Sequence, residues 1–379
     1  MKTTAAVLRA VTGARPYTDS KPLRLEEVEL GAPRAGELLI RVEAASVCHS
    51  DVSVVDGSRV RPLPMALGHE AAGVVEEVGP GVRDVKPGDH VVLTFVPSCG
   101  TCPECSSGRP ALCTPGAAAN GAGTLLHGPS LLRDGGGQVI HHHLGISGFA
   151  RHAVVARESA VVIPADVPLQ TAALFGCAVL TGAGAVLNTA AVRPGQSVAV
   201  FGLGGVGLAS VMAANVAGAV TIVAVDPVEA KRRLALELGA THAFAPEEAE
   251  SAVRDLTGGG AEVSFEAAGV PAVLEAAFRA TRRGGTTVAM GLPHPSRTLT
   301  LPALAFAGLG QSLVGSYMGS SSPQRDIPRY LALWKKGRLP VDRLQSAALP
   351  LDRINEAFEA LAAGAAVRQV LLPWAGPRR

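Results

Sequence analysis

Residues 197–226 read SVAVFGLGGVGLASVMAANVAGAVTIVAVD, and this stretch decides the fold of the second half of the chain. An apolar run at 197–201 leads into the string GLGGVG at 202–207, and a helical pattern follows. A second apolar run ends at Asp226. G-x-G-x-x-G binds a dinucleotide when it follows a strand, opens a helix and is followed by an acidic residue. The stretch therefore predicts a dinucleotide-binding βαβ unit.

Each glycine has its own task in this prediction. Gly202 makes the tight turn, Gly204 lets the backbone approach pyrophosphate, and Gly207 lets helix and strand pack closely. The helix N-terminus beside Gly205 supplies N–H groups and a positive dipole to the phosphates. Asp226 would accept hydrogen bonds from the adenosine ribose and repel a 2′-phosphate, which favours NAD over NADP. A purely structural glycine-rich turn is the alternative.

The surrounding sequence extends this unit into a larger sheet. Apolar runs alternate with helical patterns after Val192. This alternation predicts an α/β fold with a doubly wound, mostly parallel sheet whose strands are buried on both faces. The expected strands are 197–201, 220–225, 241–244, 262–266, 286–290 and 313–317.

The first half of the chain has a different texture, made mostly of strands and turns. A long segment, Ser98 to His143, includes a glycine-rich stretch from Gly116 to Gly137. The tail from Pro323 is helix-rich and returns to a final apolar strand at 367–372. The β-rich runs are 3–8, 23–30, 37–47, 71–78, 90–96 and 153–163.

Composition excludes several classes of function. Of 379 residues, 47% are hydrophobic and 17% are charged, so the chain can bury a sizeable core. The 34 basic and 32 acidic residues leave a net charge of +2. No strong basic field is available for nucleic acid or an anionic membrane. Aromatic residues, at 4%, are too few to favour a base-stacking platform.

Two further observations concern the membrane and the compartment. The uncharged stretch from Pro194 to Val225 is long enough to span a bilayer, but glycines in its middle would break one helix into two. The N-terminus MKTTAAVLRAV lacks the features of a signal peptide. Six cysteines are too few for a disulfide scaffold. We therefore expect a cytoplasmic protein without membrane spans.

Four cysteines have the spacing of a metal knuckle. Cys99, Cys102, Cys105 and Cys113 can place four thiolates around one tetrahedral Zn²⁺. With every position filled by sulfur, such a zinc ion is structural and has no room for substrate. The alternative is four free thiols on a loop.

Cys48, His69 and Cys177 remain, and their spacing alone could not unite them. An isolated cysteine or histidine commonly belongs to the core. From the residues themselves, core packing and metal ligation therefore stay open for these three positions.

The order and spacing of the motifs along the chain favour metal ligation over core packing at these three positions, because they match those of a known family. The chain resembles the zinc-dependent medium-chain alcohol dehydrogenases nearly end to end. The length of the Ser98–His143 segment is similar to that of the longer, liver-type branch. The matching pieces are Cys48-His49-Ser50-Asp51, Gly68-His69-Glu70, the four-cysteine lobe, Cys177 to Thr181, GLGGVG and Asp226.

The resemblance implies a division into domains. A GroES-like, mostly β catalytic domain would occupy residues 1–178 and include the structural zinc lobe at 98–114. A Rossmann domain that binds NAD would occupy residues 179–320. Residues 321–379 would return to the catalytic domain.

The resemblance also implies a catalytic zinc site and therefore two zinc ions per chain. Cys48, His69 and Cys177 would bind the catalytic ion and leave one position for water or alcohol. Asp51 and Glu70 would support these ligands, with Glu70 as an alternative ligand.

The proton relay departs from the family pattern. Ser50 matches the relay hydroxyl, but Ser53 stands where the family has a relay histidine, and serine is no base near neutral pH. We expect the proton to leave through water or through His49.

Further contacts are implied by the same resemblance. His49 and Arg368 would meet the cofactor pyrophosphate, Lys231 the adenosine ribose, and Thr181 and Val206 the nicotinamide. For the charged residues, a solvated surface is the alternative. The substrate pocket would be lined by Ser50, Phe95, His143, Leu144, Leu292 and Met318.

Most of these pocket residues are apolar, which favours a hydrophobic substrate. His143 is unusual, because the liver-type branch commonly has an apolar or aromatic residue there. It can hydrogen-bond a polar substrate, or it can be an ordinary loop histidine in the run His141–His143.

The implied function is hydride transfer between NAD(H) and a small-molecule alcohol, aldehyde or ketone. A thiol-adduct formaldehyde dehydrogenase is a second possibility, disfavoured by Arg59 and Ala117 at positions where that branch has other residues. A non-catalytic zinc-stabilised binding protein is a third. The family also implies a homodimer, or a tetramer, paired through the edge at Gln311–Tyr317. The substrate, the physiological direction and the pathway are not implied.

Overall fold

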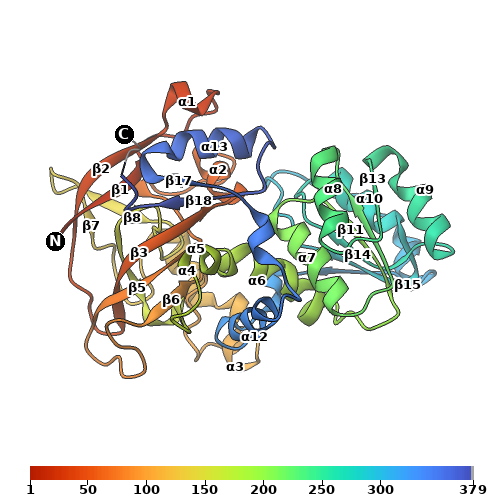
Figure 1. Cartoon of the computed structure of the whole chain (residues 1–379), viewed down its shortest axis with the longest axis horizontal. Helices are drawn as coiled ribbons and strands as arrows, with labels where there is room; N and C mark the ends of the chain where they lie inside the picture. Colours follow the sequence, from red (N-terminus) through yellow and green to blue (C-terminus); the bar gives the residue numbers. More distant parts are fainter. Residues whose placement is uncertain (377–379) are drawn as a thin grey trace. The chain divides into compact units, whose positions relative to one another are not determined.

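The structure, a computed structural model, describes residues 1–376 (Figure 1). The chain divides into two compact units. Unit 1 consists of Met1–Cys177, Ser322–Pro328 and Gln345–Arg379, and unit 2 consists of Ala178–Ser321 and Arg329–Leu344.

Unit 2 is built on a six-stranded sheet in which every neighbouring pair is parallel. The strand order is β13-β12-β11-β14-β15-β16. The succession of strands reverses between β11 and β14, so the ligand-binding position of a doubly wound sheet falls at their carboxyl ends. The strands are β11 (Ser197–Phe201), β12 (Thr221–Val225), β13 (His242–Phe244), β14 (Ala261–Glu266), β15 (Thr281–Ala289) and β16 (Ser312–Gly315).

Helices follow these strands and pack on the sheet, as the green and cyan part of Figure 1 shows. Consecutive strand residues point to opposite faces. Val198, Ala199 and Val200 are all fully buried, so β11 is covered on both faces. The helices wholly within unit 2 are α6 (Leu180–Gly184), the π-helical segment η4 (Ala185–Thr189), α7 (Gly205–Val216), α8 (Glu229–Glu237), α9 (Pro246–Thr257), α10 (Pro271–Arg279), α11 (Ala303–Ala307) and the 3₁₀ turns η5 (Tyr317–Ser320) and η6 (Val341–Leu344).

Unit 1 combines a small closed barrel with a larger, mostly antiparallel sheet. The barrel order is β1-β2-β7-β8-β4, and the sheet order is β10-β6-β5-β3-β18-β17, with β9 paired to β3. Barrel strands are β1 (Lys2–Leu8), β2 (Leu23–Leu30), β4 (Met65–Ala66), β7 (Leu132–Arg133) and β8 (Val139–His142). Sheet strands are β3 (Glu37–Val47), β5 (Ala71–Val78), β6 (His90–Leu93), β9 (His152–Ala156), β10 (Ala160–Ile163), β17 (Gln345–Pro350) and β18 (Arg368–Leu372).

Short helices complete unit 1. They are α1 (Tyr17–Ser20), α2 (His49–Val55), α3 (Pro103–Ser106), α4 (Thr114–Ala122), α5 (Leu169–Ala173), α13 (Ile354–Ala362), and the 3₁₀ turns η1 (Pro110–Leu112), η2 (Arg157–Ser159) and η7 (Leu351–Arg353). The predicted combination of a doubly wound parallel sheet and a mostly β unit is confirmed.

One helix lies where the sequence indicated only turns. The helix α4 occupies the start of the glycine-rich stretch. Its alanines favour a helix, a proline stands in the first turn, and Gly123 ends it in the left-handed region at φ 67°. The high glycine content of the stretch indicated turns, and the start and stop signals of the helix were therefore missed.

The tail is shared between the two units, which differs from the expectation that all of 321–379 returns to unit 1. Residues 329–344, the end of α12 (Pro323–Lys335) together with η6, belong to unit 2. Leu339, Val341 and Leu344 are fully buried there. Arg343 also pairs with Glu237 of α8.

Within residues 1–376, one helical stretch is long and apolar enough to cross a membrane by length and composition. It runs over Leu169–Thr189, not over the uncharged Pro194–Val225 stretch, which folds as a strand, a turn, a helix and a second strand. In the most apolar part of this helix, 89% is buried inside the structure, so the helix belongs to the core.

Candidate active site

Cys48 stands at the junction of β3 and α2 and caps the helix. Its backbone is extended (φ −117°, ψ 153°), and its N–H donates to Asp51 Oδ2 at 2.9 Å. The Asp51 side chain therefore closes a capping box around the first turn. This local arrangement fixes the direction of the Cys48 thiol.

His69 follows a glycine that no other residue can replace without strain. Gly68 has φ +98°, and a Cβ there would lie 2.4 Å from the Phe149 backbone nitrogen. His69 Nδ1 lies 2.8 Å from Asp51 Oδ1, and both side chains are buried. A carboxylate at Nδ1 fixes the tautomer, so that Nε2 keeps its lone pair.

Cys177 lies in a π-helical turn, Phe175–Val179 (η3), inside the helical stretch from Leu169 to Thr189. Single π turns within helices are frequent at functional sites. The neighbouring Gly176 allows a close approach, because a Cβ there would lie 2.3 Å from the Leu93 carbonyl oxygen. The helix thus brings Cys177 against the end of β6.

The three residues that sequence spacing could not unite lie together in unit 1. One ligand atom from each of Cys48, His69 and Cys177 lies within 4.8 Å of the others, and all three residues are buried. Two sulfurs and an imidazole form a donor set that suits a catalytic Zn²⁺ with an open position.

The two thiols also titrate as a pair. Hydrogen bonding with Cys177 lowers the pKa of Cys48, and the same contact together with burial raises the pKa of Cys177. A thiolate is therefore available beside the imidazole, so the residues present fit zinc.

Glu70 and Arg368 form a buried ion pair beside this cluster. Arg368 Nη1 lies 3.2 Å from Glu70 Oε2 and donates to the Val47 carbonyl at 3.1 Å. Burial opposes the charge on Arg368, but Glu70 together with Cys48 and Cys177 outweighs burial and raises the Arg368 pKa. The guanidinium is thus already engaged inside unit 1, and its contact with pyrophosphate stays a prediction.

Three residues of α2 bear on the proton route. Ser50 Oγ lies 3.8 Å from Cys48 Sγ, as a residue beside the reacting centre should. The Ser53 hydroxyl donates to the His49 carbonyl at 3.1 Å, so it is bound to its own helix. His49 is exposed. The structure therefore supplies no base at position 53.

Phe95 and His143 flank the ring of His69. Both rings are edge-on to it, with centroids 5.6 Å and 5.4 Å away. Burial is the main reason that the pKa of His143 is lowered. Leu144, which follows, is also buried. With Ser50, four of the six predicted pocket residues therefore belong to unit 1, and Phe95 and His143 lie against the ring of a cluster residue.

Sequence reasoning missed two residues that hold the backbones of Phe95 and His143 in place. Asn120 of α4 donates from Nδ2 to the Phe95 carbonyl at 2.7 Å. Ser147 Oγ accepts the His143 N–H at 3.1 Å. Neither residue belongs to a motif, and nothing in the local sequence distinguishes them from ordinary loop residues.

The other two predicted pocket residues belong to unit 2. Leu292 is 51% exposed within the structure. Met318 is buried and adopts a left-handed backbone with φ 50°. Their role in a substrate pocket stays a prediction.

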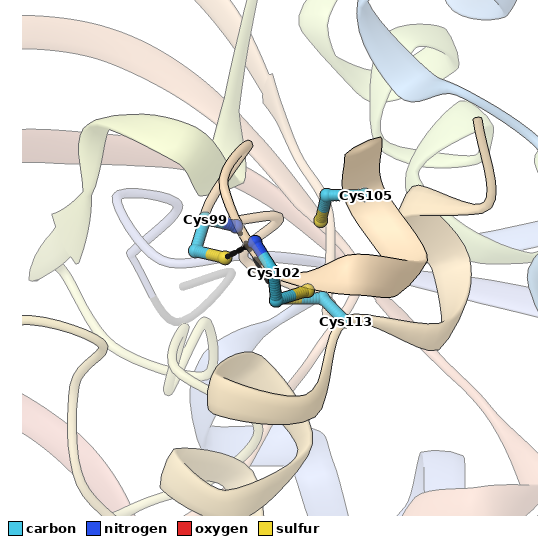
Figure 2. Close-up of side chains that lie close together, drawn as sticks. All are labelled: Cys99, Cys102, Cys105 and Cys113. Carbon is cyan, nitrogen blue, oxygen red and sulfur yellow. Dashed lines mark hydrogen bonds between the residues drawn. The ribbon is translucent and has the colours of Figure 1, made fainter. Parts of the chain in front are cut away.

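The four lobe cysteines converge as their spacing predicted (Figure 2). One sulfur from each lies within 4.8 Å of the others. Cys99 Sγ accepts the Cys102 N–H at 3.3 Å, and Cys113 Sγ accepts the Cys99 N–H at 3.3 Å. Backbone donors, first that of Thr101, lower the pKa of Cys99 to about 6. Four convergent sulfurs with amide donors fit a closed structural zinc site.

The GLGGVG turn of unit 2 has the geometry of a phosphate cradle. Gly202 has φ +91°, which only glycine adopts freely. A Cβ at Gly207 would lie 1.8 Å from the Gly202 carbonyl oxygen, so helix and turn are in close contact there. A Cβ at Gly204 would meet nothing within 4 Å. Open space thus lies at the one glycine expected to face pyrophosphate. Gly205 and Val206 begin α7.

Asp226 lies at the carboxyl end of β12 and is buried. Its Oδ2 accepts the Leu203 N–H at 2.8 Å, and its Oδ1 accepts the Val228 N–H at 2.9 Å. Arg232 donates to the Asp226 carbonyl at 2.7 Å, which places a cation at the same corner.

Lys231 and Thr181 complete the predicted cofactor contacts in unit 2. Lys231 is partly exposed on α8, and Thr181 is buried on α6. Their contacts with cofactor stay predictions.

Comparison with known proteins decides the family. The alcohol dehydrogenase GroES-like domain matches residues 34–165, and the zinc-binding dehydrogenase domain matches residues 205–336. An NDMA-dependent alcohol dehydrogenase of Amycolatopsis methanolica is 40% identical, over 98% of this chain and 99% of the relative. A geraniol dehydrogenase of Castellaniella defragrans is 41% identical, over 97% of each chain. The chain belongs to the zinc-dependent medium-chain alcohol dehydrogenase family.

Solved structures agree with this membership. An alcohol dehydrogenase zinc-binding domain protein from Burkholderia ambifaria superposes with a TM-score of 0.93 at 41% identity, over 98% of this chain and 99% of that one. Benzyl alcohol dehydrogenase from Acinetobacter calcoaceticus gives 0.91 at 32% identity, over the same shares. As a zinc-type alcohol dehydrogenase, the chain is an oxidoreductase that acts on small-molecule alcohols and uses zinc and a nicotinamide cofactor.

Proposed function

We propose that the chain transfers hydride between NAD(H) and an alcohol, aldehyde or ketone, with a catalytic and a structural zinc ion in each chain. The observation that carries this proposal is the convergence of Cys48, His69 and Cys177 in a buried cluster. The geraniol and benzyl alcohol dehydrogenases among its relatives favour an allylic or aromatic alcohol.

The chain's own residues prepare this chemistry. When bound by the cluster, zinc supplies Lewis-acid catalysis, which lowers the pKa of a bound hydroxyl. Asp51 holds the Nδ1 side of His69 and so directs Nε2 toward the metal position. Ser50 Oγ lies 3.8 Å from Cys48 Sγ and would pass the proton onward. Since Ser53 is bound to its helix, the proton leaves through water or His49.

The cofactor preference rests on Asp226. The negative charge of its carboxylate would repel the 2′-phosphate of NADP, which favours NAD. In Asp226→Asn the repulsion is removed while one oxygen acceptor remains, and Arg232 can then face the phosphate. We expect the ratio of kcat/KM for NADP to that for NAD to rise about tenfold, a change of about 1.4 kcal/mol.

Steady-state kinetics with both cofactors measures this ratio. Equal thermal stability of the variant and the parent is the control, because Asp226 also accepts two backbone hydrogen bonds. A parent enzyme that already prefers NADP would contradict the assignment.

One relative suggests a different electron acceptor. The Amycolatopsis methanolica enzyme is named NDMA-dependent. Alcohol oxidation should therefore be assayed with NAD, with NADP and with NDMA in parallel, and with and without a low-molecular-weight thiol. If turnover requires NDMA, then NDMA rather than free NAD is the electron acceptor. If turnover of formaldehyde requires the added thiol, the thiol-adduct reaction is favoured.

We also propose a homodimer paired through unit 2. The strand β16 is the edge of the six-stranded sheet and has an unpaired side within the described residues. Three apolar side chains near it are exposed, with Leu304 at 74%, Phe306 at 42% and Leu309 at 37%. An unpaired edge with apolar neighbours favours pairing with a second chain. Sedimentation should give a dimer at micromolar concentration, and a monomer would contradict this.

Cytoplasmic location is proposed as well. All six cysteines are free thiols and all belong to the two clusters, and such thiols persist in a reducing compartment.

A further inference from the structure

Glu266 is a buried carboxylate that the mechanism above does not use. It ends β14 in unit 2 and is 1% exposed. Its Oε1 accepts the N–H of Ala268 at 2.7 Å and the N–H of Gly269 at 2.6 Å. Within residues 1–376, no lysine, arginine or histidine forms an ion pair with this carboxylate. A buried charge without a counterion costs stability, and such groups are found most often where function needs them.

Backbone donors keep the Glu266 side chain in its charged form. Burial raises its pKa above the ordinary value, but N–H groups of the surrounding backbone oppose this rise. A carboxylate accepts from such donors through both oxygens, whereas a protonated acid would turn an O–H toward one of them, so the donors favour the carboxylate. A negative charge is therefore held inside unit 2 without a neutralising cation. The donors are the N–H groups of Gly269, Ala268, Val270 and Gly291.

The carboxylate stands at the carboxyl edge of the sheet, on the side of β11 away from Asp226. A Cβ at Gly202 would lie 2.9 Å from the Ala268 nitrogen, so the segment after Glu266 lies against the GLGGVG turn. A Cβ at Gly291, which follows β15, would lie 2.7 Å from Glu266 Oε2. Each half of a doubly wound sheet binds one mononucleotide. Since Asp226 is the predicted partner of the adenosine half, the nicotinamide half belongs at the ends of β14 and β15.

We propose that Glu266 strengthens the binding of NAD⁺ relative to that of NADH. The inference rests on the proposed dehydrogenase function and deepens it. The nicotinamide ring of NAD⁺ carries a positive charge, and hydride transfer to it leaves the neutral ring of NADH. An unpaired carboxylate attracts only the charged ring, and burial weakens the screening of this attraction by water and salt. During alcohol oxidation the charge therefore favours uptake of NAD⁺ and release of NADH.

The test measures the Kd of NAD⁺ and the Kd of NADH for the zinc-loaded protein by titration calorimetry, with no alcohol present. The quantity compared is the Kd of NADH divided by the Kd of NAD⁺. In Glu266→Gln, which keeps the shape and removes the charge, we expect this ratio to fall about fivefold, through weaker NAD⁺ binding. Glu266→Asp keeps the charge and should keep the ratio. Glu262→Gln removes a carboxylate that pairs with Arg282 near the amino end of the same strand, and should leave the ratio unchanged.

The outcomes separate a charge effect from a structural one and from the proposed function. A distorted site would weaken both forms of the cofactor equally, so an equal loss in Glu266→Gln, or an unchanged ratio, would overturn the inference and leave Glu266 a structural residue. Should Glu266→Gln fail to fold, Glu266→Met also removes the charge and provides the same ratio. A parent protein that binds neither NAD⁺ nor NADH would overturn the proposed function, and this inference with it.

Discussion

Replacement of Cys48 by serine should lower alcohol oxidation by about a thousandfold or more and remove one zinc ion from each chain. Serine offers a hard, protonated hydroxyl where the metal needs a thiolate. A thousandfold loss corresponds to about 4 kcal/mol of transition-state stabilisation, an ordinary effect for a group that acts as part of a unit. The fold should survive, because Cys48 caps α2 and serine is a preferred capping residue.

Elemental analysis and thermal unfolding complete this experiment. The variant should hold one zinc ion per chain and unfold near the temperature of the parent. The matched control is Cys99→Ser, which should lose the other zinc ion and destabilise the lobe, because four sulfurs close that site. Retention of both zinc ions and of activity in Cys48→Ser would show that Cys48 is a core residue.

Replacement of Gly204 by valine should leave the fold intact and weaken cofactor binding by about a hundredfold or more. The backbone there has φ −74° and ψ −174°, which valine adopts without strain, and a Cβ meets nothing within 4 Å. The added side chain therefore occupies the open space expected for pyrophosphate. Since each factor of ten is about 1.4 kcal/mol, this loss is about 2.7 kcal/mol of binding.

The contrast with Gly207 makes this prediction specific. A Cβ at Gly207 would lie 1.8 Å from the Gly202 carbonyl oxygen, so Gly207→Ala should lower the unfolding temperature itself. The KM and Kd for NAD, with thermal unfolding in parallel, distinguish the two variants. Unchanged NAD affinity in Gly204→Val would place the cofactor elsewhere.

Local sequence patterns predicted most of the sheet strands. Four predicted runs, 23–30, 37–47, 71–78 and 197–201, coincide with β2, β3, β5 and β11. The valines within these runs and the turn residues that flank them are local signals, so the sequence alone identifies the strands. Other features depend on distant contacts. The π turn at Cys177 fits against Leu93, and residues 329–344 join unit 2 through contacts that no local signal records.

The same distinction holds in the candidate site. Cys99 to Cys113 lie in one short segment, so their spacing alone predicted the cluster that the structure shows. Cys48, His69 and Cys177 come together only through the fold, and their union was predicted from family resemblance. Neither route revealed the shared Asp51 oxygen of His69 and His143 or the pairing of Glu70 with Arg368. These contacts join segments that are far apart in the sequence.

The measurement that tests the central claim most directly is the formation of NADH by the zinc-loaded protein in the presence of an alcohol. Preparations are first shown to hold two zinc ions per chain, and geraniol and benzyl alcohol are then offered with NAD. The account predicts alcohol-dependent NADH formation that disappears in Cys48→Ser. A fully zinc-loaded protein that turns over no alcohol or carbonyl with NAD, NADP or NDMA would contradict it.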